Sequence, residues 1–210
     1  MTTAGLALIV SGFALLTSLV SLWLNSLKPF ELKLSHDTPT FRLYKITPQI
    51  SGDKERKSWW IPSFDIGLSF YNLGKKPGEV LDIRIIGDLA SHRTHRKFVF
   101  YPKWIVDYAE FNQSRGERFE WLKTAILREW YPSTLGANDQ KDLHAILESD
   151  RWDHKESGEM TLTLQIVSSS DMQWQTCAEY KLLITEDMFD DRSSYTPYDE
   201  KIERLRKIDH

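Results

Sequence analysis

The stretch AGLALIVSGFALLTSLVSLWLNSL, residues 4–27, divides this chain into two parts of different chemistry. Leu, Ile, Val and Phe fill eleven of the 21 positions from Ala4 to Leu24, and no charged residue precedes Lys28. A helix of that length spans about 31 Å, which matches the roughly 30 Å hydrocarbon core of a bilayer. The stretch therefore predicts a single transmembrane anchor helix within residues 1–28.

A cleaved signal peptide is the competing interpretation of the same stretch. Such peptides combine a basic start, an apolar core of about 7–15 residues and a cleavage site of small residues. Here the apolar run is longer, no Lys or Arg precedes Lys28, and Trp23 and Leu24 interrupt the small residues near its end. Pro29 disfavours helical backbone in the residue before it, so the helix should end at Lys28. We expect an uncleaved signal anchor.

Flanking charge predicts the orientation of this anchor. No Lys or Arg lies on its N-terminal side, whereas Lys28, Lys33, Arg42 and Lys45 follow it closely. The positive-inside rule then places the N-terminus outside and the C-terminal domain in the cytoplasm. The opposite topology stays open at this point, because long domains can be translocated whatever their charge.

Small and polar residues form a regular pattern inside the apolar run. They recur at alternating spacings of three and four residues, so they share one face of the helix. Small side chains let two backbones approach closely in lipid, and Ser or Asn can hydrogen-bond across the contact. The pattern predicts an interface with a protein partner or a second copy of this chain, although Ala and Ser are common in membrane helices. Its members are Ala4, Ala7, Ser11, Ala14, Ser18, Ser21 and Asn25.

Residues 30–185 show the period-two alternation that is typical of β-strands. It is clearest in residues 64–71 and 160–167, where every second side chain is apolar. Short polar stretches at residues 72–78 and 168–171 indicate turns between antiparallel neighbours. Seven or eight such strands predict a mostly β domain, an immunoglobulin-like antiparallel β-sandwich that lacks the paired cysteines of antibody domains.

Two further segments depart from this alternation. Ser114 and Glu117 have the spacing of a capping box, and apolar residues follow at helical spacing as far as Trp130. We expect an amphipathic helix over about residues 114–130, inserted into the sandwich. The chain becomes acidic after the domain ends at residue 185, and residues 186–210 are predicted to form a polar tail with a short helix.

Motifs that bind nucleotides or perform known catalysis do not occur in the sequence. It contains no Walker loop and no G-x-G-x-x-G, H-E-x-x-H, G-x-S-x-G or C-x-x-C motif. His92 and His95 form an H-x-x-H pair, but the Arg and Lys residues around them would repel a metal ion. We therefore predict no catalytic residue, no cofactor and no metal site.

Residues 91–97, SHRTHRK, are predicted to form a basic loop between two strands. Such a loop can contact phosphates, and near a membrane each basic side chain contributes about 1 kcal/mol toward anionic lipid. A solvated hairpin loop is the simpler interpretation. The candidate residues for an anionic ligand are His92, Arg93, His95, Arg96 and Lys97.

Composition and the anchor together favour a non-enzymatic function. A net charge of −3 argues against nucleic acid as a partner, and the single Cys177 excludes an internal disulfide. The predicted function is a membrane-anchored module for protein interaction. The alternatives are an enzyme of unrecognised type with a site near residues 114–130, since such scaffolds host catalysis, and a sensor of lipid headgroups or nucleic acid through the basic loop.

Overall fold

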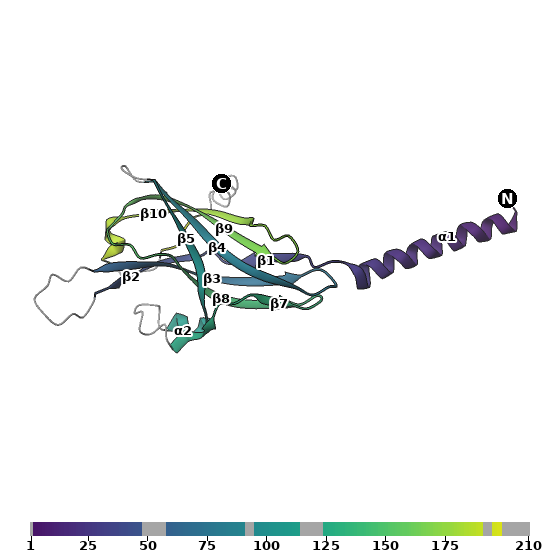
Figure 1. Cartoon of the computed structure of the whole chain (residues 1–210), viewed down its shortest axis with the longest axis horizontal. Helices are drawn as coiled ribbons and strands as arrows, with labels where there is room; N and C mark the ends of the chain where they lie inside the picture. Colours follow the sequence, from purple (N-terminus) through teal and green to yellow (C-terminus); the bar gives the residue numbers. More distant parts are fainter. Residues whose placement is uncertain (1, 48–57, 91–94, 114–123, 191–194, 199–210) are drawn as a thin grey trace, which may run out of the picture.

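An apolar helix projects from one end of a curved antiparallel sheet in the computed structural model (Figure 1). The structure describes residues 2–47, 58–90, 95–113, 124–190 and 195–198. Helix α1 (Thr3–Leu22) continues into the π-helical turn η1 (Trp23–Leu27), where the Lys28 amide donates to the Trp23 carbonyl at 2.8 Å. No side chain of α1 is buried. The predicted N-terminal apolar helix is confirmed.

Strands and isolated bridges make up 54% of the described residues, and the strands join in one antiparallel sheet. Its central order is β1-β3-β8-β5-β4-β9-β10, and β2, β6 and β7 pair with β3, β5 and β4. A short helix, α2 (Tyr108–Gln113), follows β5, and a 3-10 turn, η2 (Glu186–Phe189), follows β10. The strands are β1 (Leu32–His36), β2 (Thr40–Ile46), β3 (Trp59–Asn72), β4 (Gly78–Ala90), β5 (His95–Val106), β6 (Ile126–Glu129), β7 (Ser133–Leu135), β8 (Gln140–Glu148), β9 (Gly158–Ser168) and β10 (Gln175–Ile184).

The sheet curves until its two edges nearly meet. Strands β1 and β2 pair with successive halves of β3 and form one edge, and β10 forms the other. The Tyr180 hydroxyl on β10 lies 3.1 Å from His36 Nδ1 on β1. Residues 195–198 link the same edges, because Tyr195 bridges to Phe41 of β2 and Tyr198 bridges to Lys181 of β10. The domain is therefore a nearly closed, barrel-like sheet.

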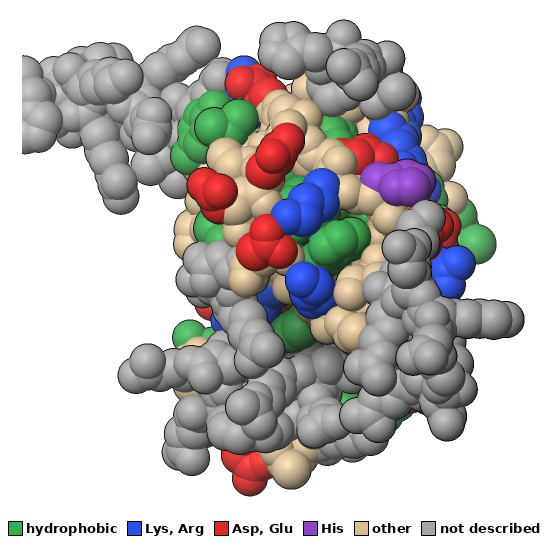
Figure 2. All heavy atoms as spheres, turned by 90° about the vertical axis from the view of Figure 1, so that its left-hand side faces the viewer, with side chains coloured by type: hydrophobic (Ala, Val, Ile, Leu, Met, Phe, Trp, Pro, Cys, Tyr) green, Lys and Arg blue, Asp and Glu red, His purple; other side chains and the backbone are tan. Residues whose placement is uncertain are grey.

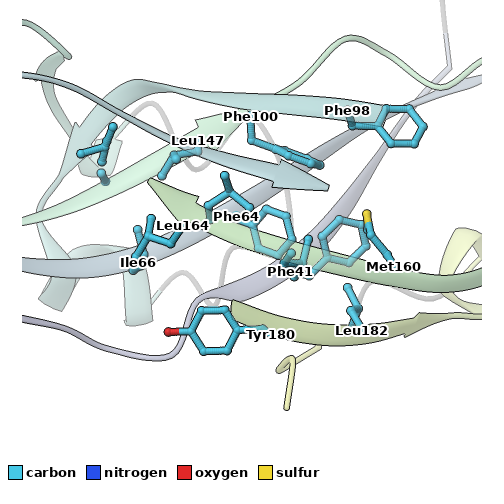
Figure 3. Packing of buried hydrophobic residues seen from close by; sticks show 14 of the residues in the cluster. Phe41, Phe64, Ile66, Phe98, Phe100, Leu147, Met160, Leu164, Tyr180 and Leu182 are labelled. Carbon is cyan, nitrogen blue, oxygen red and sulfur yellow. The ribbon is translucent and has the colours of Figure 1, made fainter. Parts of the chain in front are cut away.

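Large apolar side chains fill the inside of this sheet. The Phe64 ring lies 5.1 Å from Phe41 and 4.8 Å from Phe100 between ring centroids. Figure 3 shows these rings with Met160 and Leu164 pointing into one shared core. Each strand places alternate residues on that core, which explains the period-two pattern of the sequence.

The end of the barrel away from α1 is closed by η2 (Figure 1). Phe189 is buried there, and its carbonyl accepts a hydrogen bond from Trp60 Nε1 at 2.9 Å. Its ring lies 5.3 Å from Trp60 and 5.9 Å from Trp152. Thus residues 186–189 and 195–198 pack on the barrel, while residues 199–210, which include most of the expected C-terminal helix, lie outside the described residues.

The mostly β fold is confirmed, but the immunoglobulin-like sandwich is not. A sandwich needs two separate hydrogen-bond ladders, whereas β5 joins both parts of this sheet. Its first half pairs with β4 and its second half with β8. The partner changes between Phe100 and Tyr101, and a bulge follows in the β5–β8 pairing between Pro102 and Trp104. A bulge accommodates a proline, which has no N–H to donate to the sheet, and β5 continues to Val106.

The expected helix over residues 114–130 is wrong at its end, because only Thr124 and Ala125 of its described part are helical. Residues 126–129 form strand β6 on the open edge of β5, with Ile105 opposite Arg128. Edge pairing gives this backbone hydrogen-bond partners that a capping-box pattern does not reveal. The helix that is present, α2, begins earlier, and Asp107 Oδ1 accepts hydrogen bonds from the Ala109 and Glu110 amides. Ser114 and Glu117 lie outside the described residues.

Candidate functional site

Residues 28–31 join α1 to the barrel and are hydrogen-bonded to the β3–β4 turn. The Lys75 and Lys76 amides donate to the Lys28 carbonyl at 2.9 and 3.2 Å, and the Leu73 amide donates to the Glu31 carbonyl at 2.8 Å. The Lys28 ammonium also forms an ion pair with the Glu31 carboxylate at 2.5 Å. This connection is an ordered part of the fold.

The buried side chain of Asn72 organises this junction. Its Nδ2 donates to the carbonyls of Lys76 at 2.9 Å and Gly136 at 2.6 Å. Its Oδ1 accepts from the amides of Gly74 at 2.8 Å and Glu31 at 3.4 Å. One amide, with two donors and one acceptor oxygen, therefore links the connecting segment, the β3–β4 turn and the β7–β8 turn.

Two glycines let the connecting segment approach this closely. A Cβ on Gly74 would lie 1.9 Å from the Pro29 carbonyl oxygen, and a Cβ on Gly78 would lie 2.2 Å from the Phe30 ring. Both distances are far below van der Waals contact. Any larger residue at position 74 or 78 would clash with residues 28–31, so the packing of this segment requires glycine at both positions.

Helix α1 with η1 is long and apolar enough to cross a membrane. It spans Thr3–Leu27 with a mean hydropathy of 2.1 in its most apolar window, none of which is buried. A signal sequence near an N-terminus has the same properties. The predicted small-residue face lies on this helix. Near the C-terminal end of the helix, Ser18, Ser21 and Asn25 line a shallow, open depression. Asn25 Nδ2 donates to Ser21 Oγ at 3.1 Å, and the interface itself stays a prediction.

In the described half of the basic segment, two of the three basic side chains have acidic partners. Residues 95–97 begin β5, and His95 Nδ1 lies 2.9 Å from Asp88 Oδ1. The Arg96 guanidinium pairs with Glu156 and lies over the Phe98 ring. Figure 2 shows acidic and basic side chains interspersed on the barrel end opposite α1. The backbone of Lys97 lies opposite Asp88 in the β4–β5 register, and His92 and Arg93 lie outside the described residues.

A groove of about 530 Å³ crosses the outer face of the sheet between β1 and α2. Its floor includes Gly67 and His144, which face each other across β3 and β8. A Cβ on Gly67 would lie 2.4 Å from Asp37 Oδ2 and 3.7 Å from His144 Nδ1. The missing side chain of Gly67 therefore makes room for the Asp37 carboxylate beside the histidine. The other charged residues that line the groove are Arg128, Lys141 and Asp142.

Below the groove, His144 is held by a buried chain of polar contacts through Asp65 to Arg42. Its Nε2 lies 3.2 Å from Asp65 Oδ1, and Asp65 Oδ2 accepts from Arg42 Nε at 2.8 Å. The three side chains are only 8–13% exposed. Because Asp65 engages Nε2, Nδ1 is the ring nitrogen directed to the space above Gly67. The rings of Tyr108 and Phe111 cover the histidine at 4.7 and 5.7 Å.

Hydrogen bonds also set the charge of Asp142 at the groove. Side-chain bonds, first with Ser69 and then with Gln140, hold the pKa of the Asp142 carboxyl below its ordinary value. The carboxylate is therefore ionised at neutral pH. In the part of the chain that the structure describes, no three His, Cys, Asp or Glu side chains are placed to hold a metal ion.

Sequence reasoning did not find this groove. Asp65 lies 23 residues from Arg42 and 79 from His144, so no motif spacing connects them. Two features of the sequence could have pointed to it: Gly67, and the Asp65 carboxylate on the polar side of a strand that alternates apolar and polar residues. Neither feature predicts which strand pairs with β3 at this position.

No family model matches this chain, and no curated protein matches it. Among solved structures, it is similar to the ApaA protein of Bordetella pertussis, with 13% identity and a TM-score of 0.32 over 74% of this chain and 94% of that one. It is also similar to a structural genomics target designated SoR45, with 11% identity and a TM-score of 0.28 over 73% and 81% of the two chains. Likeness at this level assigns no function.

Replacing Asn72 with Ala should release the connecting segment. The change removes four hydrogen bonds at a buried junction, so the free energy of unfolding should fall by about 1–3 kcal/mol. The Leu73, Lys75 and Lys76 amides, which donate to residues 28–31, should also exchange hydrogen faster. Hydrogen exchange read by mass spectrometry checks both effects. The exposed Gln173→Ala variant is the control, and equal exchange in the two variants would contradict this role of Asn72.

Replacing Asp65 with Asn should destabilise the domain strongly. The isosteric change leaves the nearly buried Arg42 guanidinium without its carboxylate, which costs about 3 kcal/mol or more. The matched control is Asp37→Asn in the same groove, because Asp37 is exposed and its loss should cost no more than about 0.5 kcal/mol. Urea unfolding curves compare the two variants. Equal midpoints would show that the chain of polar contacts does not stabilise this face.

Proposed function

We propose that this protein is a membrane-anchored binding module. Helix α1 crosses the bilayer, and the barrel-like domain presents its outer groove to a protein partner. The observation that carries the proposal is an unburied apolar helix of 25 residues, joined to a folded domain by a hydrogen-bonded segment. A cleavable leader is removed from the mature protein, so hydrogen bonds that fix its last residues to the domain would serve no purpose.

The energetics of the helix support a membrane location. Each Leu, Ile, Val or Phe favours insertion by about 0.3–0.6 kcal/mol, so the eleven between Ala4 and Leu24 contribute very roughly 5 kcal/mol. In water the same side chains are all exposed, from Leu6 to Leu24. Trp23 lies where the helix ends, as expected of an aromatic residue at a membrane interface.

The orientation and the helix face belong to the same proposal. The basic residues that follow α1 favour an external N-terminus and a cytoplasmic barrel. The small-residue face, from Ala4 to Asn25, is the surface on which a second helix would pack, either from another copy or from a partner protein. The small side chains of Ser18 and Ser21 would let such a helix approach closely.

The groove supports a second candidate function, an enzyme. A histidine whose ring is oriented by a buried carboxylate can accept a proton from a bound molecule. His144 has this arrangement with Asp65, and Nδ1 is the nitrogen on the groove side. The binding module is preferred because the described lining contains no cysteine and no metal cluster beside this histidine.

The anchor is tested by expressing the full chain and extracting membranes with alkaline carbonate. The chain should remain in the membrane pellet with α1 uncleaved, as read by intact mass. Replacing Leu15 and Leu16 with Lys should move it to the soluble fraction, because each charge at the helix centre opposes insertion by about 2.5–3.5 kcal/mol. The same positions changed to Ile serve as the control. A mature protein that begins after residue 27 would contradict the proposal.

The same cells report the orientation through Cys177. The thiol is on the exposed face of β10, and desolvation raises its pKa to about 11, so labelling should be run at alkaline pH. A membrane-impermeant thiol reagent should label it only after permeabilisation. Labelling in intact cells would contradict a cytoplasmic barrel.

A further inference from the structure

We propose that the end of the barrel from which α1 leaves rests on the headgroup layer of the same bilayer and binds its anionic phospholipids. The inference rests on the proposed membrane anchor. Three turns meet at this end: residues 72–78, 135–140 and 168–175. Gly78 pairs with Leu135, Val80 pairs with Ser168, and the Ser169 amide donates to the Glu79 carbonyl at 2.9 Å. They therefore form one continuous surface, the junction face.

Apolar side chains project from two of these turns. Leu73 is 44% exposed beside the connecting segment, and Met172 is 70% exposed at the tip of the β9–β10 turn. Met172 has a φ of 56°, and its amide donates to the Ser168 carbonyl at 2.9 Å, so an ordered turn presents this side chain. An apolar tip fixed toward the side where an apolar helix departs is suited to the boundary between headgroups and acyl chains.

Two lysines of the junction face can contact anionic headgroups. Lys75 and Lys76 form no ion pair among the described residues, whereas Lys28 beside them is paired with Glu31. The other carboxylates at this end have hydrogen-bond partners: Glu79 accepts from Thr134 Oγ1 at 3.3 Å, Asp139 accepts from the Gly136 and Gln140 amides, and Asp171 accepts from Gln175 Nε2 at 2.7 Å. Among the described residues of this face, the lysines left to contact a headgroup are therefore Lys75 and Lys76, beside the apolar side chains of Leu73 and Met172.

The junction keeps this face close to the bilayer. Only residues 28–31 separate the end of η1 from β1, and the Asn72 hydrogen bonds fix them to the β3–β4 turn. The short connection therefore keeps the lipid headgroups at a high local concentration around the junction face. Contacts from two lysines and two apolar tips are then sufficient to hold the domain against the surface.

Site-directed spin labelling of the full chain tests this contact. A Cys177→Ser background allows one nitroxide at Met172→Cys, with the protein in nanodiscs of phosphatidylcholine and about 30% phosphatidylserine. Collision with oxygen, which concentrates in lipid, is compared with collision with a water-soluble nickel chelate. Two positions calibrate the scale. Phe13→Cys reports α1, and Leu183→Cys reports the opposite end of β10, where the side chain is 58% exposed.

The label at Met172 should favour oxygen, like the label at Phe13, while the label at Leu183 should favour nickel. Adding Lys75→Glu and Lys76→Glu should release the tip, since each lysine contributes about fivefold to the ratio of docked to free domain. This release should occur with phosphatidylserine and not in pure phosphatidylcholine.

Nickel access at Met172 equal to that at Leu183, with Phe13 in lipid, would overturn the contact and leave the anchor intact. A water-exposed label at Phe13 would overturn the anchor itself. Protection of Met172 that is unchanged when Lys75 and Lys76 become Glu in phosphatidylserine nanodiscs would overturn the anionic-lipid assignment.

Discussion

One buried side-chain amide determines how the two parts of this protein are joined. Asn72 lies at the end of the longest strand, and its hydrogen bonds reach the connecting segment and both turns beside it. Because buried polar groups must be paired, this network permits only one arrangement of those segments. Gly74 and Gly78 are needed for the same reason, since any side chain there would displace Pro29 or Phe30. The helix and the barrel are therefore coupled, and the proposed functions depend on that coupling.

The sequence predicted elements better than it predicted their partners. Alternation of apolar residues identified the strands that include residues 64–71 and 160–167, and the β9–β10 hairpin, because burial of one face imposes period two. The same alternation carries no information about which edge each strand joins. The barrel-like closure depends on β5 changing partners between Phe100 and Tyr101, and on residues 195–198 bridging β2 and β10. These are long-range backbone contacts with no local signal.

The groove could not be predicted from the sequence, because it too depends on long-range strand pairing. Arg42, Asp65 and His144 come from β2, β3 and β8, and only the register of the sheet brings them together. The segment of residues 91–97, by contrast, is conspicuous in composition, yet His95 and Arg96 are paired with Asp88 and Glu156. The density of basic residues in 91–97 suggested a ligand site, but the fold places acidic partners beside two of them. Arg42, Asp65 and His144 are far apart in the sequence, and the fold brings them together.

The central claim is that helix and barrel form one unit at the bilayer, and the most direct test is a distance distribution. Two nitroxides, at Leu16→Cys in α1 and Leu183→Cys on β10 in a Cys177→Ser background, would be measured by double electron–electron resonance in nanodiscs. The hydrogen-bonded junction predicts one narrow distance peak. A broad distribution would show that the barrel swings freely on its anchor, which would contradict the account.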